Sequence, residues 1–308
     1  MMPTIVLLGP TGQVGMALRR ALAPLGRLVI LDRHSAHGVG DLLQPEAVAQ
    51  AVLDCQPQAV VNAAAYTAVD LAEQEPEQAH AINAHAVGLV AQAAQAAGAW
   101  MVHYSTDYVF NGSGQQPWVE SDETQPLNVY GQSKRAGELA LMDACARHLV
   151  FRTSWVYALH GSNFAKTMVK LALQRERLSV IDDQVGAPTG ADLIADVTAH
   201  ALREVLCGDS VQGQSGVYHL SAQGACTWHA YASHVIGLAQ RIRPDWAWKV
   251  QEIVSVDSSA FATAARRPLN SRLDTTRLER QWGLAMPAWE QGVDHMLQQW
   301  LPLARDLI

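Results

Sequence analysis

Residues 4–15, Thr-Ile-Val-Leu-Leu-Gly-Pro-Thr-Gly-Gln-Val-Gly, decide the fold that we expect for this chain. They begin with a nearly all-apolar run, which is typical of a parallel strand buried on both faces. Three glycines at three-residue spacing follow: Gly9, Gly12 and Gly15. Apolar side chains then recur at helical spacing, at Val14, Leu18 and Leu22. A ligand-free glycine turn is the alternative, but strand, glycine loop and helix in this order are the context of a pyrophosphate site at a helix N-terminus.

Strands and helices are expected to alternate from residue 4 to about residue 155. Further apolar strands are predicted over 28–31, 59–61, 100–104 and 149–152. Helices are predicted from about 45, over 77–97, from 130, and over 163–174, 191–205 and 231–242, with a polar loop at 207–216. This order predicts an α/β fold with a Rossmann-type doubly wound parallel sheet and right-handed crossovers.

We expect two units from this pattern. Residues 1–157 should form a dinucleotide-binding Rossmann domain, and part of 185–225 should return to it. Residues 158–308 should form mainly a smaller α+β domain that binds the substrate. A chain of 308 residues is long enough for one compact domain or two closely associated ones.

Composition excludes several classes of protein. The net charge is −7 with no basic stripe, so nucleic-acid binding is not indicated. No apolar run is long enough to span a bilayer, and no signal peptide precedes the first strand, so we expect no membrane contact and a cytoplasmic location. The four cysteines are too dispersed for a disulfide framework or a metal cluster, and the twelve histidines are scattered.

A tyrosine and a lysine suggest the chemistry. Tyr130-Gly131-Gln132-Ser133-Lys134 places a phenol and an ammonium on one helical face, one turn apart. An ammonium beside a phenol favours the phenolate, so we expect Lys134 to lower the pKa of Tyr130 from the usual value of about 10. Such a tyrosine can protonate an alkoxide or deprotonate an alcohol near neutral pH. The alternative is a solvated helix face on which the two residues fall by chance.

The carboxyl ends of the predicted strands carry further candidates. Thr106 and Asp107 follow the strand at 100–104, where a hydroxyl is well placed to bind a carbonyl oxygen. Asp32 suits the hydroxyls of an adenosine ribose, whereas Arg33 suits a 2′-phosphate, so the residues leave NADH and NADPH open. A basic loop suits a diphosphate and a base, with a solvated loop as the alternative; it contains Arg266, Arg267, Asn270 and Arg272.

Taken together, these residues resemble the extended short-chain dehydrogenase/reductase family and, within it, the dTDP-4-dehydrorhamnose reductases. The resemblance covers nearly the whole chain. The glycine trio and Tyr-x-x-x-Lys mark only the superfamily, and further marks lie at 62–70, 105–110, 152–157, 163–168 and 186–190. It implies NAD(P)H-dependent reduction of the C4 ketone of dTDP-4-dehydro-L-rhamnose to dTDP-L-rhamnose, which serves the synthesis of cell-surface polysaccharides such as lipopolysaccharide.

The resemblance also implies a role for individual residues. Tyr130 would protonate the alkoxide, Lys134 would hold the nicotinamide ribose and Thr106 would bind the ketone oxygen, while Asn83 would support the lysine. Contacts to the substrate would come from Thr106, Asp107, Trp155, Asn163, Arg266 and Asn270. The NADPH or NADH cofactor would contact Gly9, Gly12, Gln13, Val14, Gly15, Asp32, Asp41, Leu42, Ala65, Tyr66, Thr67, Tyr104, Tyr130 and Lys134.

One departure concerns a metal. Some members of this family are dimers bridged by Mg²⁺ on glutamates, and the matching positions here are Ala17, Asp192 and Gln299. Only Asp192 keeps a carboxylate, and Mg²⁺ needs oxygen ligands. We therefore expect no metal site, and either a monomer or a homodimer.

Two other functions remain open at this stage. One is another nucleotide-sugar dehydrogenase or epimerase; a dehydratase is disfavoured because it needs Asp-Glu after the threonine, whereas this chain has Asp107-Tyr108. The other is a non-catalytic NAD(P)-binding regulatory subunit of the methionine adenosyltransferase type. The presence of Tyr130, Lys134 and Thr106 argues against that. The preference for dTDP over UDP also stays open, since one methyl group contributes only about 1–3 kcal/mol.

Overall fold

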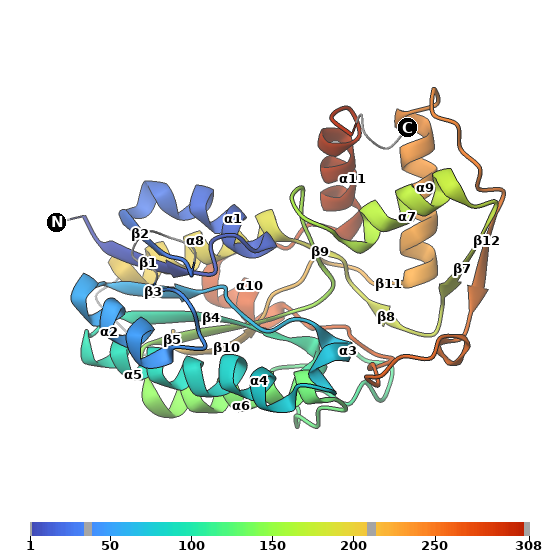
Figure 1. The fold of residues 1–308 in the computed structure, drawn as a ribbon. Coiled ribbons are helices and arrows are strands. Elements are labelled where there is room, and N and C mark those ends of the chain that lie inside the picture. Colours follow the sequence, from blue (N-terminus) through green and yellow to red (C-terminus); the bar gives the residue numbers. More distant parts are fainter. Residues whose placement is uncertain (1, 34–38, 208–213, 305–308) are drawn as a thin grey trace.

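The computed structural model describes residues 2–33, 39–207 and 214–304. Within them, six parallel strands form one central sheet (Figure 1). The strands are β1 (Thr4–Leu8), β2 (Arg27–Leu31), β3 (Ala59–Asn62), β4 (Trp100–Thr106), β5 (His148–Thr153) and β10 (Gly216–His219). Their order across the sheet is β10-β5-β4-β3-β1-β2. The predicted α/β fold with a Rossmann-type parallel sheet is confirmed.

Helices cover both faces of this sheet. Successive side chains along each strand point to opposite faces and therefore enter two separate cores. In β1, Ile5 and Leu7 belong to one buried cluster, and Val6 and Leu8 belong to the other. The first cluster is closed by α1 (Gln13–Leu22), α8 (Ala191–Cys207) and α10 (Thr276–Trp282). The second is closed by α2 (Pro45–Cys55), α5 (Ala86–Ala96) and α6 (Val129–Ala144), on the opposite side of the sheet in Figure 1.

The helix predicted over 77–97 is not uniform. It consists of α4 (Pro76–His80), a π-helical turn η2 (Ala81–His85) and α5, and it ends at Gly98, whose φ of +66° is a left-handed conformation. Single π turns in helices occur often at functional sites. The short helices α3 (Val69–Ala72), η1 (Ala23–Leu25) and η3 (Asp107–Val109) complete this part of the chain.

The glycine loop has the close contacts that its sequence predicts. Gly9 has φ +71°, and a Cβ there would lie 2.5 Å from the nitrogen of Ala64. A Cβ on Gly15 would lie 1.9 Å from the carbonyl oxygen of Gly9, so only glycine lets α1 pack this closely against the loop. At Gly12 the nearest atom is the same oxygen, at 3.7 Å. Gly9 and Gly15 are therefore required by the fold, whereas a Cβ at Gly12 would make only an ordinary van der Waals contact.

The C-terminal part forms a second lobe with its own core (Figure 1). Its main helices are α7 (Phe164–Gln174), α9 (Trp228–Ile242) and α11 (Trp289–Trp300). Its paired strands are β7 (Arg177–Ile181) with β12 (Glu252–Val256), β6 (Val156–Tyr157) with β9 (Thr189–Gly190), and β8 (Val185–Gly186) with β11 (Cys226–Thr227). A 3-10 turn, η4 (Ser258–Ala260), follows β12.

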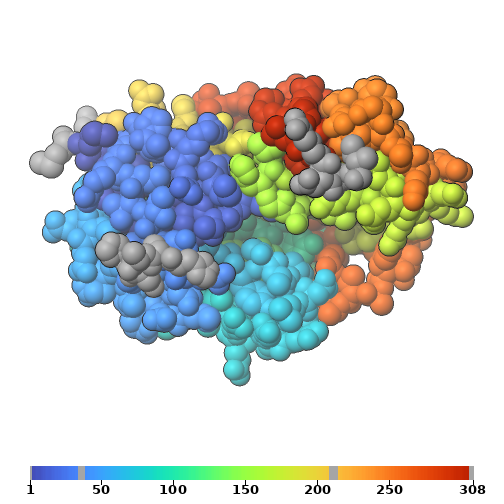
Figure 2. Space-filling view, turned by 45° about the horizontal axis from the view of Figure 1, so that its top comes forward, coloured from blue at the N-terminus to red at the C-terminus, as the bar shows by residue number. Residues whose placement is uncertain are grey.

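The two lobes are joined by several crossings of the chain. After β9 the chain enters α8, which packs on α1, and it then adds β10 beside β5 at the edge of the central sheet. Figure 2 shows the surface hollowed where the blue and cyan N-terminal segments meet the yellow-green segments of the C-terminal lobe. Most of the predicted polar loop at 207–216 lies outside the described residues. None of the described helices is both long enough and apolar enough to cross a membrane.

Candidate active site

The first turn of α6 is held against the end of β4. Asn128 caps the helix, because its Oδ1 accepts a hydrogen bond from the nitrogen of Gly131 at 2.8 Å. A Cβ on Gly131 would lie 2.2 Å from the carbonyl oxygen of Tyr108, so the helix starts in close contact with η3. The rings of Tyr108 and Tyr130 meet edge to face, with centroids 5.8 Å apart. This packing places Tyr130 beside the residues that follow β4.

Lys134 is enclosed one turn further along α6. Its Nζ donates to the carbonyl oxygen of Tyr104 at 2.6 Å and lies 3.1 Å from Nε2 of His103. The other ring nitrogen of His103 faces the amide of Asn62 at 3.3 Å. Burial lowers the pKa of Lys134 to about 8, although the charge of Glu138 acts in the opposite direction. Burial and the nearby Lys134 also hold the pKa of His103 well below its usual value, so this imidazole is neutral.

The predicted lowering of the Tyr130 pKa is wrong. Burial raises the pKa of Tyr130 to about 12; a hydrogen bond with Thr106 lowers it only in part, and the charge of Asp107 raises it further. The lysine does not offset burial because its ammonium donates to the main chain of β4 and lies against His103. The phenol therefore keeps its proton at neutral pH, which is the form that a proton donor needs.

Thr106 and Asp107 form a buried pair next to that phenol. Oγ1 of Thr106 accepts from the nitrogen of Tyr108 at 3.2 Å and donates to Oδ1 of Asp107 at 3.1 Å. Asp107 is 2% exposed, and its Oδ2 has no hydrogen-bond partner among the described residues. Burial raises the pKa of Asp107 to about 7, although hydrogen bonds from Ser271 and Thr106 lower it. The side chain thus hydrogen-bonds to Thr106 and is almost inaccessible to solvent, and its predicted contact with the sugar stays a prediction.

A buried ion pair between Arg152 and Glu138 joins α6 to the central sheet. Nε and Nη2 of Arg152 each donate to one carboxylate oxygen of Glu138 at 2.8 Å, and the two side chains are 3% and 0% exposed. Arg135 adds a longer contact to the same carboxylate at 3.3 Å. Two parallel bonds between guanidinium and carboxylate fix the relative position of the groups. The pair therefore links β5 to the helix that carries Tyr130 and Lys134.

Three of these residues were not predicted from the sequence: His103, Glu138 and Arg152. A signal was present, since His103 and Arg152 are polar residues inside the otherwise apolar segments 100–104 and 149–152. A charged or polar group in a strand buried on both faces must find a partner. That argument predicts that partners exist, and only the folded chain identifies them.

The N-terminus of α1 is open to a ligand. Gly12 is its N-cap and provides no side-chain cap, and the first turn contains no acidic residue. Oε1 of Gln13 is buried and has no hydrogen-bond partner among the described residues. Val14 and Gly15 continue into the helix. Free N–H groups and the positive end of the helix dipole suit a pyrophosphate, so these residues fit a dinucleotide.

The residues predicted to bind the adenosine lie after β2. Asp32 follows the strand directly, and Gly40 packs on it so closely that a Cβ would lie 2.5 Å from the nitrogen of Asp32. Oδ1 of Asp41 accepts from the nitrogen of Leu43 at 3.1 Å, and Leu42 is buried in the core beside β1. This turn leads into α2, and it places these candidates near the glycine loop at the same edge of the sheet.

The segment after β3 is tied to α6 through Asn83. Its Oδ1 accepts from the nitrogen of Tyr66 at 2.9 Å, and its Nδ2 donates to the carbonyl oxygen of Tyr66 and to Oγ of Ser133, both at 3.0 Å. Ala65 is partly buried and Thr67 is exposed on either side. Asn83 lies in the π-helical turn, so that irregularity brings its side chain between the two elements. Its contacts hold this segment in place.

Tyr104 was also predicted to line the cofactor. Its hydroxyl lies 2.8 Å from Oγ1 of Thr198 on α8, so its ring points to the core beneath α1. Only its main-chain carbonyl faces the site, where it accepts from Lys134. This result follows from the alternation of side chains along a strand, because His103 points to the opposite side.

Trp155 follows β5 in a strained conformation. Its φ of +47° is uncommon for a residue other than glycine, and such strain persists only where the surroundings impose it. Its indole stacks on that of Trp228 with centroids 3.6 Å apart and an angle of 13°. A Cβ on Gly186 would lie 2.6 Å from the Trp155 ring, so a side chain there would displace it. The indole is thus held in one orientation from two sides.

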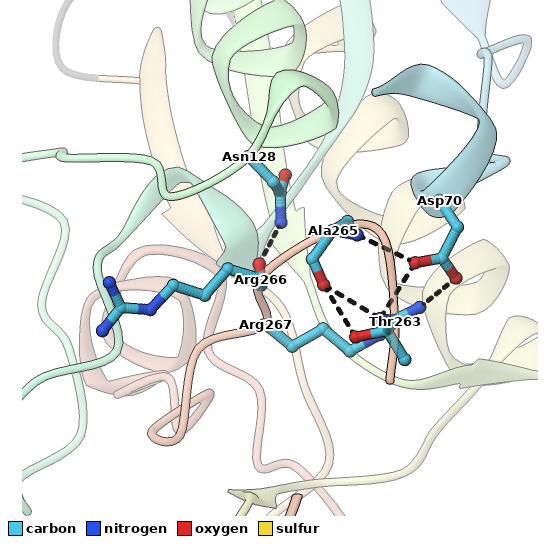
Figure 3. Close-up of polar contacts among 6 residues, drawn as sticks. All are labelled: Asp70, Asn128, Thr263, Ala265, Arg266 and Arg267. Carbon is cyan, nitrogen blue, oxygen red and sulfur yellow. Dashed lines mark hydrogen bonds and ion pairs between the residues drawn. The ribbon is translucent and has the colours of Figure 1, made fainter. Parts of the chain in front are cut away.

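The basic loop is fastened to the Rossmann part at two points (Figure 3). Nη2 of Arg267 lies 2.5 Å from Oδ2 of Asp70, whose other oxygen accepts from the nitrogen of Ala265 at 3.1 Å. Nδ2 of Asn128 donates to the carbonyl oxygen of Arg266 at 2.7 Å. The guanidinium of Arg266 points away from this network in Figure 3 and is exposed. It remains available to a ligand.

Two predicted substrate contacts are instead engaged within the protein. Nδ2 of Asn270 donates to the carbonyl oxygen of Gln116 at 2.8 Å, and its Oδ1 accepts from Nε of Arg272 at the same distance. Asn163 caps α7, accepting from the nitrogen of Lys166 at 3.1 Å, and it donates to Ala158. Both asparagines therefore stabilise the loops in which they lie.

The three positions that the resemblance relates to a bridging metal make other contacts in this structure. Asp192 lies 3.9 Å from Nη2 of Arg20, and Nε2 of Gln299 lies 2.9 Å from Nε2 of His295. No group of three or more metal-ligating side chains occurs in the described part of the chain. Ala17 contributes only a methyl group, which is buried in the core beside α8.

Comparison with known proteins identifies the family. The sequence profile described as "RmlD substrate binding domain" matches residues 2–301. The chain is 53% identical over 295 residues to the dTDP-4-dehydrorhamnose reductase of Escherichia coli (strain K12), which covers 96% of this chain and 97% of the relative. The enzyme of that name from Salmonella typhimurium is 54% identical with the same coverage. The chain belongs to the dTDP-4-dehydrorhamnose reductase family.

Solved structures agree with this membership. The dTDP-4-dehydrorhamnose reductase of Bacillus anthracis, in complex with NADP, has a TM-score of 0.84 and 32% identity, covering 97% of this chain and 100% of that chain. WbmG of Bordetella bronchiseptica, in complex with NAD, has a TM-score of 0.79, covers 99% of this chain and 95% of that chain, and at 18% identity shares only the fold. The family and the oxidoreductase class predicted from the motifs are confirmed. The roles of individual residues stay predictions.

Proposed function

We propose that this chain reduces the C4 ketone of dTDP-4-dehydro-L-rhamnose to dTDP-L-rhamnose, with NADPH or NADH as the reductant. The observation that carries the proposal is the position of a protonated Tyr130 beside Thr106, at the sheet edge that also carries the glycine loop. In a chain of this family, that arrangement supports proton donation to a keto sugar next to a nicotinamide.

The residues of the site fit a dinucleotide. The uncapped N-terminus of α1 would hold the pyrophosphate, and the absence of a side chain at Gly12 would let the backbone approach it closely. Asp32, Asp41 and Leu42 would contact the adenosine, and Ala65 and its neighbours would lie along the cofactor. Lys134 would hold the nicotinamide ribose. When bound, the reduced nicotinamide supplies the hydride that C4 receives.

Two side chains would then donate to the oxygen at C4. As negative charge develops on that oxygen, Tyr130 transfers its phenolic proton to it, and the raised pKa of the tyrosine keeps that proton available at neutral pH. The hydroxyl of Thr106 would donate a second hydrogen bond to the same atom. Donors that point in advance at the developing charge stabilise the transition state more than the ground state.

The remaining contacts would come from both lobes. The Trp155 indole, held by Trp228 and Gly186, would present its edge and free surface to the sugar. The exposed Arg266 would pair with the diphosphate. In this division residues 1–157, with α8 and β10, bind the cofactor, and the rest of 158–308 binds the nucleotide sugar. We propose a cytoplasmic enzyme that works as a monomer or homodimer without a bridging metal.

The test is oxidation of NADPH and NADH by enzymatically prepared dTDP-4-dehydro-L-rhamnose, followed by absorbance, with the product identified by NMR. We expect dTDP-L-rhamnose as the product. The ratio of kcat/KM for the two cofactors will show whether the enzyme prefers NADH, as Asp32 favours, or NADPH, as Arg33 favours. The matching UDP keto sugar is the control for the preference between thymine and uracil nucleotides. A protein that binds the cofactor but oxidises it with neither sugar would contradict the proposal and would favour a regulatory subunit.

A further inference from the structure

The hydroxyl of Thr106 has one proton to donate. Asp107 accepts it in this structure, and the substrate oxygen would need to accept it in the proposed reaction. A hydroxyl donates once and accepts twice. As the site stands, this proton is donated to Oδ1 of Asp107 at 3.1 Å, and one lone pair accepts from the nitrogen of Tyr108 at 3.2 Å. While Asp107 is ionised it can only accept, so Thr106 has no proton for a substrate oxygen.

The surroundings of Asp107 do not favour its ionised form. Its side chain is 2% exposed, and one carboxylate oxygen has no hydrogen-bond partner among the described residues. The groups that face it are the hydroxyl of Ser271 from the basic loop, the phenol of Tyr130 from α6 and Tyr108 from its own turn. Arg267, whose charge acts on the neighbouring Tyr108, is paired with Asp70. A buried carboxylate without a cation of its own is costly.

We propose that Asp107 works as a neutral carboxylic acid, which donates its own proton to Oγ1 of Thr106 and so directs the Thr106 hydroxyl to the substrate oxygen at C4. The distance of 3.1 Å between the two oxygens serves a hydrogen bond in either direction. Both lone pairs of Thr106 are then occupied, by Tyr108 and by Asp107, and its proton is left for the phenol oxygen of Tyr130 or for a substrate oxygen beside that phenol. Asp107 is a positioning residue that acts through Thr106, and this inference rests on the proposed reduction of a keto sugar.

The inference predicts a particular pH dependence. Burial raises the pKa of Asp107 to about 7, within the range in which an enzyme of this kind can be assayed. Above that pH the acid loses its proton and Thr106 turns back to it, so kcat/KM should fall roughly tenfold per pH unit. The fall should level off at about 10²- to 10³-fold, the usual effect of losing one donor to the developing charge.

Substitutions separate this role from a structural one. In Asp107→Asn the amide N–H can donate to Thr106 at every pH, so the part of the alkaline fall that Asp107 causes should disappear from the ratio of kcat/KM at pH 9 to that at pH 6, and only a change due to Lys134, whose pKa is about 8, should remain. In wild type the ratio should be about one-hundredth. Asp196→Asn, which removes an exposed carboxylate on α8, is the matched control and should keep the wild-type ratio. Thr106→Ser should also keep it, whereas Thr106→Val should lose both the activity and the alkaline fall.

A second readout does not depend on the substrate. Carbon-13 NMR of protein labelled at the aspartate carboxyl groups, with Asp107→Asn used for assignment, should show the Asp107 carboxyl protonated at pH 6 and ionised at pH 9. A carboxyl already ionised at pH 6 would overturn the inference by itself. A flat wild-type pH profile together with an inactive Asp107→Asn would also overturn it. Wild type that reduces no keto sugar at any pH would overturn the proposed function, a separate outcome from the state of the carboxyl.

Discussion

At the residue scale, burial decides the protonation of the site. Burial raises the pKa of Tyr130 to about 12 and of Asp107 to about 7, and it lowers that of Lys134 to about 8. Each shift favours the neutral form, as expected when water is removed from an ionisable group. Tyr130, Lys134 and Thr106 could be proposed from the sequence, because their spacing and strand-end positions are local properties. The prediction failed for the pKa of Tyr130, because burial depends on residues distant in the chain.

The raised pKa of Asp107 makes protein stability depend on pH. The folded state binds this proton more tightly than the unfolded state, in which the pKa is near 3.8, so the contribution is full below pH 4 and is lost as pH rises through about 7. Asp107→Asn has no such loss. The free energy of unfolding of the variant relative to wild type should therefore rise between pH 4 and pH 8, by on the order of 2–4 kcal/mol. Urea unfolding at both pH values measures it, and an equal difference at both would contradict the shift.

The buried pair of Glu138 and Arg152 should be sensitive to loss of one partner. Glu138→Gln leaves the Arg152 guanidinium buried without a counter-charge, which should cost about 3–5 kcal/mol in the free energy of unfolding. It also removes the charge that raises the pKa of Lys134, so that pKa should fall further. The double variant Glu138→Gln/Arg152→Met should recover most of the stability. A single variant within 1 kcal/mol of wild type, in the same denaturant titration, would contradict this role.

At the scale of elements, most helices and strands could be predicted from apolar periodicity and from glycine and proline signals. The π-helical turn at Ala81–His85 could not, because it depends on the fit of Asn83 between Tyr66 and Ser133. The cap of α6 follows the same logic: Asn128 is a common capping residue, but its bond to Arg266 joins segments far apart in sequence.

The glycine loop offers a pair of substitutions with opposite effects. Gly15→Ala places a methyl group 1.9 Å from the carbonyl oxygen of Gly9, so the loop must move and the protein should lose several kcal/mol of stability. Gly12→Ala meets no atom closer than 3.7 Å and should fold normally, but its methyl group enters the space for the pyrophosphate. We expect its Kd for NADPH, measured by fluorescence titration, to rise at least tenfold. Unchanged affinity in Gly12→Ala would show that the dinucleotide binds elsewhere.

At the scale of the whole molecule, the site depends on contacts between the two lobes. The Rossmann sheet could be predicted because its first five strands alternate with helices along the chain. β10 has only four residues, Gly216–His219, and its place beside β5 follows from the packing of α8 on α1. The Arg267–Asp70 pair and the Asn128–Arg266 bond likewise join the C-terminal loop to the Rossmann part, and no local pattern reveals them.

Breaking the Arg267–Asp70 pair, which holds the basic loop, should affect substrate binding more than the stability of the protein. The Asp70 side chain is 47% exposed, so its pair with Arg267 is screened by solvent and contributes little to the free energy of unfolding. Arg267→Gln should raise KM for the nucleotide sugar several-fold, speed hydrogen exchange in residues 263–272, and leave Kd for NADPH unchanged. Arg177→Gln, which breaks the exposed pair with Glu252, is the control and should change none of these. An Arg267→Gln enzyme with wild-type KM would show that the basic loop does not contribute to substrate binding.

The most direct test of the account is the rate of NADPH oxidation by dTDP-4-dehydro-L-rhamnose in wild type and in Tyr130→Phe. The variant keeps the ring and loses only the proton donor, so kcat should fall about 10²- to 10⁴-fold while Kd for NADPH stays the same. Turnover within a few-fold of wild type would contradict the account, because the proton would then come from another group.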